Sequence, residues 1–177
     1  MQKDSYIIFI LFATLASIGN SFCIGTIEEF NYKRDRTGII NNLREDIYWL
    51  IETPETFDIE YMLRTKSPNK IPALYGKLNI KVLRDNNQLV GFVAYYKLIP
   101  DLCHILFLSV NKAFRGKNYG KKLLNCAIHD LFRTGCSSVN LIVRTNNTRA
   151  KKIYKDFGFK ESYQTKQGFT ALARSKQ

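Results

Sequence analysis

Apolar residues recur along the chain with periods that predict strands in some segments and helices in others. A period of two predicts strands over residues 24–33, 77–85 and 88–98, and the Asn-Asn pair between the last two predicts a tight turn. Two continuous apolar runs, residues 103–110 and 138–144, are typical of strands inside a sheet. We therefore expect both runs to be buried on both faces.

A helical period of apolar residues predicts four helices, over residues 37–53, 54–65, 119–135 and 147–158. Thr37 is placed to cap the first helix, and Pro54 suits the first turn of the second. Residues 66–72 hold two prolines and predict a loop, and residues 159–175 predict a C-terminal hairpin. The order of elements predicts a mixed α/β (α+β) fold with helices packed on one sheet.

The N-terminal segment differs from the rest of the chain. Residues 6–18 form an uncharged apolar run behind Lys3, shorter than the roughly 20 apolar residues of a membrane span and close to the core of a signal peptide. Asp4 weakens the positive start of such a signal, so an uncleaved anchor and a buried helix stay open. We expect residues 1–22 to be a signal peptide or membrane anchor and residues 24–177 to form a single domain.

The charge of the chain widens the range of partners. With 27 Lys and Arg against 15 Asp and Glu, the net charge is +12, which attracts nucleic acid, anionic membranes and polyphosphates. The cations are spread along the chain rather than gathered in a basic tail, so a general solubility charge explains them equally well. The hydrophobic fraction of 45% excludes a disordered chain.

The cysteines do not suggest a metal site. The chain has four of them, Cys23, Cys103, Cys126 and Cys136, with no CxxC pair and only two histidines. This set lacks the ligand spacing of zinc sites, so we expect no metal and predict buried free thiols.

The stretch "FRGKNYGKKLL", residues 114–124, holds two glycines, an asparagine and four cations between an apolar strand and a predicted helix. The first amides of a helix have no acceptor within it, and the helix dipole adds partial positive charge. Small residues let a bulky anion approach such amides closely. The stretch therefore fits either a pyrophosphate-binding turn or an empty basic turn. The nucleophile elbow, the zinc-protease motif and the nucleotide phosphate loop are all absent from the sequence.

Together with "NLIVRTNNTRAKKIYKDFGF", residues 140–159, this stretch resembles the acetyl-CoA-binding core of the GCN5-related N-acetyltransferase (GNAT) superfamily. The family turn has Arg or Gln, two residues, Gly, one residue, and Gly or Ala; residues 115–120 match it with Asn118 in place of the first glycine. The resemblance implies a mostly antiparallel central sheet flanked by about four helices, with a splayed fourth and fifth strand pair. Its core motifs would lie within residues 104–160.

The resemblance also implies roles for individual residues. Leu108, Ser109 and Val110 would present main-chain groups to the pantetheine arm of acetyl-CoA, and the Val110 amide would polarise the thioester carbonyl. The pyrophosphate-binding turn would comprise Arg115, Gly116, Lys117, Asn118, Tyr119, Gly120 and Lys121. Asn147 would hydrogen-bond the amide arm, and Tyr154 would either protonate the departing thiolate or serve as a core aromatic residue.

The acceptor side is less defined by the sequence. His104 stands where histone-modifying members carry a glutamate, so it is either a general base or a structural histidine. Ile142 stands where ribosomal-protein N-terminal acetyltransferases carry a glutamate, which argues against a close copy of their mechanism. We expect the acceptor to contact residues 53–71 and the hairpin over residues 159–175, but the sequence does not identify the amine.

Two functions stay open at this point. The first is transfer of an acetyl group from acetyl-CoA to an amine of a small molecule or protein, which Asn147 and Tyr154 favour. The second is a catalytically drifted module that binds acyl-CoA or another polyanion, including nucleic acid, which Asn118 slightly favours. Because acetyl-CoA is made in the cytoplasm, the N-terminal segment implies a tethered enzyme, a cytoplasmic one, or one delivered into another cell.

Overall fold

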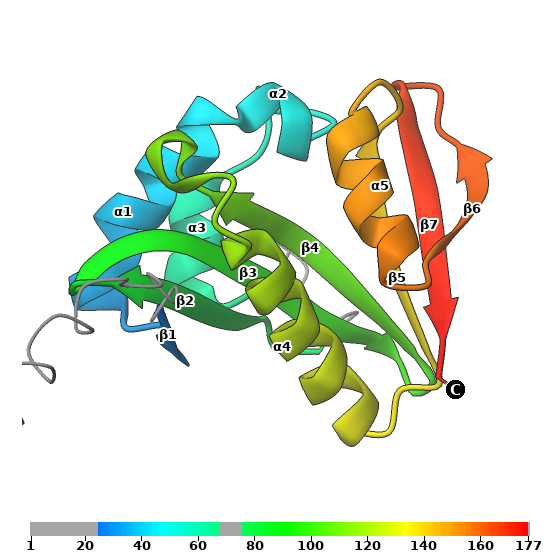
Figure 1. The fold of residues 1–177 in the computed structure, drawn as a ribbon, viewed down its shortest axis with the longest axis horizontal. Coiled ribbons are helices and arrows are strands. Elements are labelled where there is room, and N and C mark those ends of the chain that lie inside the picture. Colours follow the sequence, from blue (N-terminus) through cyan, green and yellow to red (C-terminus); the bar gives the residue numbers. More distant parts are fainter. Residues whose placement is uncertain (1–24, 68–75, 177) are drawn as a thin grey trace, which may run out of the picture.

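A computed structural model describes residues 25–67 and 76–176, in which seven strands form one sheet with helices on both faces (Figure 1). The predicted signal peptide or anchor, residues 1–22, and both prolines of the predicted loop 66–72 lie outside the described residues. Within the described ranges, no helix is both long and apolar enough to cross a membrane.

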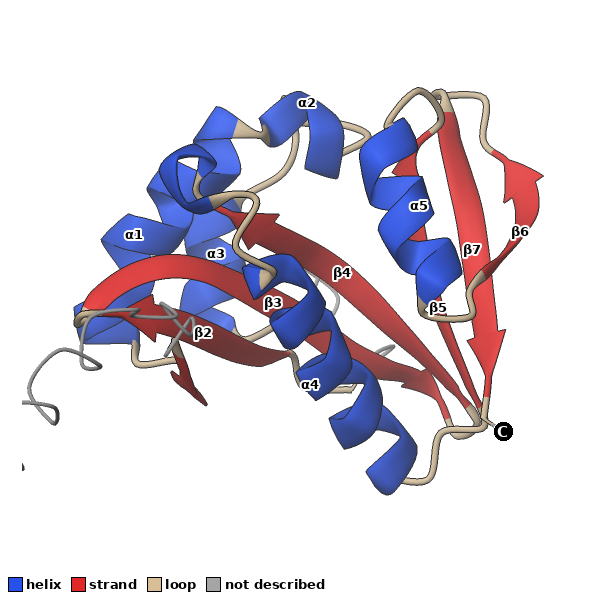
Figure 2. Cartoon of the chain, in the orientation of Figure 1, coloured by secondary structure: helices blue, strands red, loops and turns tan. Residues whose placement is uncertain are grey.

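The elements follow one another in the predicted order (Figure 2). The strands are β1 (Thr26–Glu29), β2 (Asn79–Asp85), β3 (Gln88–Ile99), β4 (Leu102–Val110), β5 (Ser138–Arg144), β6 (Lys160–Gln164) and β7 (Phe169–Ser175). The helices are α1 (Tyr32–Glu45), α2 (Ile47–Leu50), α3 (Ile59–Thr65), α4 (Tyr119–Arg133) and α5 (Thr148–Asp156), with a short 3₁₀ helix, η2, at Lys112–Phe114.

The sheet has the order β1-β2-β3-β4-β5-β7-β6. All neighbouring strands are antiparallel except β4 and β5, which are parallel. Because α4 connects these two strands, it crosses over one face of the sheet. The predicted α+β fold with a mostly antiparallel sheet is confirmed.

A β-bulge divides β4 into two parts. Ala94 pairs with Phe107 and Tyr95 pairs with Ile105, so Leu106 is an extra residue in β4. An extra residue reverses the alternation of side chains between the two faces of a strand. Accordingly, Ile105 packs in the core beneath α4, whereas Phe107 packs in the core beneath α1 and α3.

Each face of the sheet carries its own hydrophobic core. The predicted apolar stripe of α4 is buried against one face, and it consists of Leu123, Leu124, Ala127, Ile128 and Leu131. Ile39 and Leu43 of α1, with Met62 and Leu63 of α3, cover the other face. Burial of each such side chain contributes about 1.5–3 kcal/mol, so the two cores hold the helices to the sheet.

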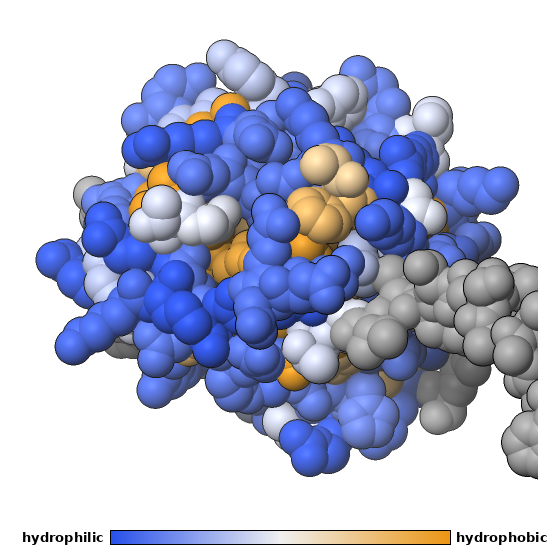
Figure 3. Space-filling view, turned by 60° about the vertical axis from the view of Figure 1, so that its left-hand side comes forward, coloured by the Kyte–Doolittle hydropathy of each residue, from blue (hydrophilic) through white to orange (hydrophobic). Residues whose placement is uncertain are grey.

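The surface is mostly hydrophilic on the face that Figure 3 shows. Among the described residues, the exposed large apolar side chains are Tyr48, Trp49, Ile99 and Tyr163. Two of these four belong to the single turn of α2, which places an aromatic pair at one point of the surface.

The first helix begins earlier and ends earlier than predicted. The side chain of Asn31 accepts a hydrogen bond from the Arg34 amide (3.2 Å) and caps α1, which begins at Tyr32 rather than at Thr37. The predicted helix 37–53 is also not continuous, because α1 ends at Glu45 and α2 begins after Asp46. The polar first turn of α1 carries no apolar period, so the pattern misses its start.

The second helix also begins elsewhere. Pro54 was expected in its first turn, but α3 begins at Ile59 and Pro54 lies in the preceding turn. Asp58 caps α3 by accepting a hydrogen bond from the Tyr61 amide (2.9 Å). The hydrogen bond from an aspartate cap sets the start of a helix more strongly than the preference of proline for the first turn. Here the Asp58 cap therefore decides where α3 begins.

The two predicted strands before and after the Asn-Asn pair and their tight turn are confirmed, whereas the strand predicted over residues 24–33 is shorter, because α1 begins at Tyr32. Asn86 and Asn87 have φ of 49° and 64°, as a two-residue hairpin turn requires. The run 103–110 forms β4, the central strand, but only its alternate residues are fully buried. The prediction that every side chain of this run is buried was therefore only half correct, because the other side chains of β4 are only partly covered.

The prediction of free thiols is wrong for two cysteines. Cys103 at the start of β4 and Cys136 before β5 form a disulfide, and Cys126 is free. Their separation of 33 residues resembles no sequence pattern, and the parallel pairing of β4 with β5 brings them together. The bond closes a loop that contains the whole of α4.

We expect this disulfide to stabilise the fold. Closing a 33-residue loop lowers the entropy of the unfolded chain by an amount worth about 3–4 kcal/mol. Denaturant unfolding of the oxidised protein and of a Cys103→Ala/Cys136→Ala variant measures this difference in the free energy of unfolding. Cys126→Ala is the matched control. Equal midpoints for the oxidised protein and the double variant would show that the bond contributes nothing.

Candidate active site

β4 and β5 begin side by side and then part. They pair only over Leu102–Ile105 and Ser138–Leu141, and they diverge toward the end of the sheet where α2 lies (Figure 1). A cleft of about 600 Å³ opens at this point, lined by the end of β4, α2, α5 and residues 114–116 and 118–121. We call it the β4–β5 cleft. The splayed strand pair that the resemblance implied is therefore present.

The peptide groups of Leu108 and Val110 point toward the parted side of β4. The Asn111 amide donates to the Val90 carbonyl oxygen (2.9 Å), and Val110 lies opposite Gly91. This register makes Val110 and Gly91 a non-hydrogen-bonded pair of the antiparallel ladder. The N–H and C=O groups of Val110, and of Leu108 two residues earlier, are therefore directed away from β3. An extended ligand can align with them as a neighbouring strand would.

The turn between β4 and α4 has a left-handed backbone at two positions. Gly116 has φ of 88° and Asn118 has φ of 60°. A Cβ atom on Gly116 would meet nothing within 4 Å, so this glycine supplies conformational freedom and an open face. Asparagine tolerates the left-handed region better than most residues, which explains how Asn118 replaces a glycine of the family turn.

The start of α4 offers amide groups to the cleft. The first hydrogen bond of the helix runs from the Lys122 amide to the Asn118 carbonyl oxygen (3.1 Å). The amides of Gly120 and Lys121 precede it, so the helix gives them no acceptor. Both residues line the β4–β5 cleft, where an anion would also gain from the positive end of the helix dipole.

The side chain of Arg115 holds the end of β4 in place. Its Nε donates to the Val110 carbonyl oxygen (2.9 Å), and its Nη2 pairs with Oδ2 of Asp46. Ser109 Oγ donates to the same carboxylate oxygen (3.4 Å). Arg115 therefore connects the turn to β4 and to the junction of α1 and α2.

The other long side chains of the turn point to different places. Lys121 lines the β4–β5 cleft, whereas Lys117 is absent from its lining and places Nζ 5.4 Å from the ring of Phe114. Tyr119 is buried in the core beneath α4, and its hydroxyl donates to Asp85 Oδ2 (2.5 Å). Backbone amides, more than the lysines, are therefore the groups of this turn that could hold an anion.

Asn147 has a structural role that the sequence did not reveal. Its Oδ1 accepts a hydrogen bond from the Ala150 amide (3.1 Å) and caps α5. Asn147 also lines the β4–β5 cleft, and its Nδ2 has no partner among residues 25–67 and 76–176. The same side chain can therefore cap the helix and donate a hydrogen bond to a ligand.

Tyr154 lies on α5 with 8% of its surface exposed, and it lines the β4–β5 cleft. Its ring packs against Phe159, and its hydroxyl has no hydrogen-bond partner in the described part of the chain. Burial raises the pKa of Tyr154 to about 12. The phenol is therefore protonated at neutral pH and is able to donate a proton into the cleft.

His104 lies away from the cleft. Its Nδ1 is 2.6 Å from Oδ1 of Asn140, its ring is 5.5 Å from that of Tyr96, and it stands where β4 still pairs with β5. Burial lowers the pKa of His104. These contacts favour the structural reading of this histidine. Among the described residues, no three His, Cys, Asp or Glu side chains gather as metal ligands would.

Sequence reasoning missed several residues that line the cleft, and five of them are Asp46, Trp49, Leu50, Arg149 and Lys152. The first three belong to α2 and the residue before it, which the apolar pattern placed within one long helix. The two cations lie on α5, and they follow Asn147 at positions that no motif marks. None of the five stands at a motif position, and only the structure shows that they line the cleft.

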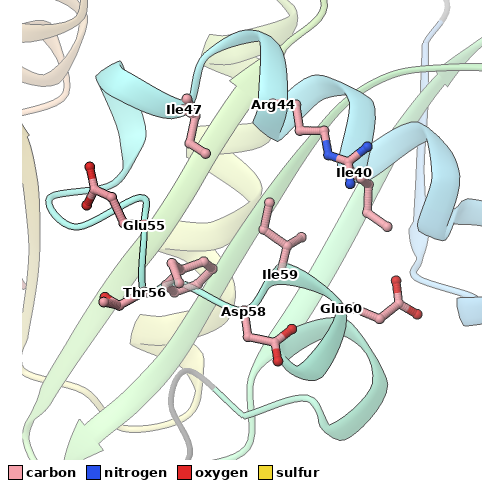
Figure 4. A pocket seen from close by; sticks show the side chains of 9 residues that line it. Ile40, Arg44, Ile47, Glu55, Thr56, Asp58, Ile59 and Glu60 are labelled. Atoms are coloured by element: carbon pink, nitrogen blue, oxygen red, sulfur yellow. The ribbon is translucent and has the colours of Figure 1, made fainter.

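A second hollow of about 450 Å³ lies on the other side of α2 (Figure 4). Ile40, Ile47 and Ile59 are directed into it from α1, α2 and α3. Glu55 and Asp58 also line it, within the segment 53–71 where we expected the acceptor. That expectation stays a prediction.

The family of the chain follows from comparison with known proteins. The sequence model of the acetyltransferase (GNAT) family matches residues 44–159, which include β4, the turn, α4, β5 and α5. This protein belongs to the GNAT family. The sequence resemblance is confirmed.

Curated relatives match about half of the chain. A [ribosomal protein bS18]-alanine N-acetyltransferase from Haemophilus ducreyi is 36% identical over 84 residues, 48% of this chain and 57% of that protein. A mycothiol acetyltransferase from Corynebacterium glutamicum is 29% identical over 85 residues, 48% of this chain and 29% of that protein. The chain thus spans little more than half of the first relative and less than a third of the second.

Solved structures share the fold over nearly their full length. Ard1 from Thermoplasma volcanium has a TM-score of 0.67 at 23% identity and covers 85% of this chain and 97% of its own. A putative acetyltransferase from Salmonella typhimurium, solved with acetyl-CoA, has a TM-score of 0.68 at 18% identity and covers 85% and 93%. PaiA N-acetyltransferase from Thermoplasma acidophilum, solved with coenzyme A, has a TM-score of 0.64 at 21% identity and covers 86% and 99%.

The two roles of Asn147 can be separated by substitution. Aspartate caps a helix as well as asparagine but cannot donate a hydrogen bond, so Asn147→Asp should weaken acetyl-CoA binding about tenfold without lowering the melting temperature. Asn147→Ala should lower both, because it also removes the cap. Calorimetric titration and thermal unfolding measure the two effects. If Asn147→Asp bound acetyl-CoA with unchanged affinity, Asn147 would act only as the cap of α5.

Proposed function

We propose that this protein transfers an acetyl group from acetyl-CoA to an amine. The observation that carries this proposal is the β4–β5 cleft, which joins three chemically distinct parts in one space. Leu108 and Val110 offer backbone groups along one wall, the turn before α4 offers amides to a pyrophosphate, and Tyr154 offers a proton. Family membership and the curated relatives named as acetyltransferases support the same activity.

Substrate placement follows from the polar groups of the cleft. The pantetheine arm lies along β4 and takes the place of the missing neighbouring strand. The thioester carbonyl oxygen accepts a hydrogen bond from the Val110 amide, which stabilises the negative charge that develops there. The pyrophosphate occupies the start of α4, with Lys121 contributing charge. Asn147 donates to the amide arm.

The reaction proceeds by direct attack in a ternary complex. The neutral amine nitrogen forms a bond to the thioester carbon, the carbon–sulfur bond breaks, and the thiolate leaves with the electron pair. Tyr154 gives its proton to the thiolate and regains one from water. The nitrogen loses its extra proton to water, because His104 is held by Asn140 outside the cleft.

The relatives do not agree on an acceptor. One is named as an N-acetyltransferase for the alanine of a ribosomal protein, which supports an acceptor amine, and another is named for mycothiol, so the names do not identify one acceptor. Ile142 occupies the position of the glutamate that the sequence comparison associated with ribosomal-protein N-terminal acetylation. We therefore propose that residues other than a glutamate at position 142 bind the acceptor amine.

A binding and turnover experiment on the full chain tests this function. Acetyl-CoA should bind, raise the melting temperature and release free CoA thiol when a panel of primary amines is supplied. Binding without release of thiol for any amine would favour the catalytically drifted module. No stabilisation by CoA, together with tight, salt-sensitive binding to DNA, would contradict the proposal and favour a nucleic-acid-binding protein.

Tyr154→Phe should slow turnover without preventing binding. Loss of the proton donor should lower kcat about 100-fold, while the affinity for acetyl-CoA stays within about twofold. Tyr48→Phe, at an exposed tyrosine that does not line the cleft, is the matched control and should leave kcat unchanged. Reduced acetyl-CoA affinity in the Tyr154 variant would instead assign the residue to packing.

The pH profile gives a second readout on Tyr154. Its raised pKa keeps the phenol protonated up to about pH 11, so the wild-type enzyme should show no alkaline loss of kcat from this group below that value. A fall of kcat with an apparent pKa near 10 that disappears in Tyr154→Phe would contradict the assigned pKa.

A further inference from the structure

A carboxylate with no assigned role lines the β4–β5 cleft. Asp46 stands between α1 and α2 with 8% of its surface exposed. Its amide donates to the Leu43 carbonyl oxygen (3.2 Å), and its carbonyl oxygen accepts from the Trp49 amide (2.8 Å). Because the backbone on both sides is held by helical hydrogen bonds, the carboxylate has a fixed position.

Only one of the two carboxylate oxygens is engaged. Arg115 Nη2 and Ser109 Oγ both contact Oδ2 of Asp46. Within residues 25–67 and 76–176, Oδ1 has no hydrogen-bond partner. An ionised carboxylate accepts about four hydrogen bonds. Asp46 therefore has unused capacity to bind a donor in the cleft.

Asp46 lies beside the part of the cleft where the proposed reaction takes place, so its free oxygen is placed to accept a hydrogen bond from a substrate. Its partner Ser109 lies between Leu108 and Val110, the two residues whose peptide groups are directed toward the thioester. The other carboxylate of the cleft lining, Asp156, belongs to the last turn of α5 and lies 3.8 Å from Lys121. Asp46 is thus the anionic group beside the part of β4 that holds the reacting carbonyl.

We infer that Asp46 binds the amino group of the acceptor, which therefore arrives as a positively charged primary amine. This inference rests on the proposed function, and it names the residue that positions the second substrate. Oδ1 accepts a hydrogen bond from the ammonium group, while Arg115 holds Oδ2. The ammonium then releases a proton to water before its nitrogen attacks, so Asp46 binds the amine and does not act as the general base.

Two ligands that differ in one group test the inference. The probes are tetra-alanine amide and its analogue with a hydroxyl in place of the terminal amine, each titrated into the full-length protein saturated with CoA. Wild-type protein should bind the amine at least tenfold more tightly than the hydroxyl analogue. Asp46→Asn should lose most of that ratio, because an ion-paired hydrogen bond is worth about tenfold to a hundredfold in affinity.

The controls separate binding of the amine from damage to the fold or to the cofactor site. Glu45→Gln removes an equal charge from the exposed neighbouring position and should preserve the ratio of affinities. Affinity for CoA should stay within about twofold in Asp46→Asn. A weaker CoA affinity, or an equal loss for both probes, would mean that Asp46 acts only through Arg115 and would overturn the inference.

The wild-type protein alone is sufficient if Asp46→Asn does not fold. Equal affinity for the amine and the hydroxyl analogue, or binding of neither probe while CoA binds, would overturn the role of Asp46 and leave the cofactor site intact. Failure of CoA itself to bind would contradict the proposed function as well. Measurement in 50 and 500 mM salt adds a charge-specific readout, because only the amine should lose affinity as salt rises.

Discussion

The parting of β4 and β5 is the constraint on which the rest of the structure depends. Their pairing ends after Ile105 and Leu141, and the bulge at Leu106 turns the remainder of β4 onto a different course. The backbone groups of Leu108 and Val110 are thereby deprived of a neighbouring strand. These groups line the β4–β5 cleft, so this edge can pair with an extended ligand.

The protein compensates for part of this loss with a side chain. Arg115 Nε donates to the Val110 carbonyl oxygen, which leaves the amide of the same residue available on the cleft side. The guanidinium also reaches Asp46 at the α1–α2 junction, so one residue joins the anion-binding turn, the central strand and the helices of the other face. A disturbance in any of these three parts should therefore reach the end of β4 at Val110.

Parts of the site could be predicted because their chemistry is local. Gly116 and Asn118 are needed for backbone conformations that few residues adopt, and Tyr154 and Asn147 stand at fixed distances within one helix and its cap. Asp46 escaped prediction because a carboxylate in an amphipathic segment looks like an exposed residue. Its burial arises only when β4 and Arg115 pack against it.

By itself, the sequence determined the order of the elements, the glycine-containing turn before α4 and the family, since each depends on residues close together in the chain. The local caps Asn31 and Asp58, which the apolar period does not mark, set where α1 and α3 begin. The tertiary structure alone decided that Cys103 joins Cys136 and that His104 faces Asn140 rather than the cleft. The physical reason is that strand pairing and side-chain burial depend on neighbours distant in sequence. Periodicity and motif spacing do not record those neighbours.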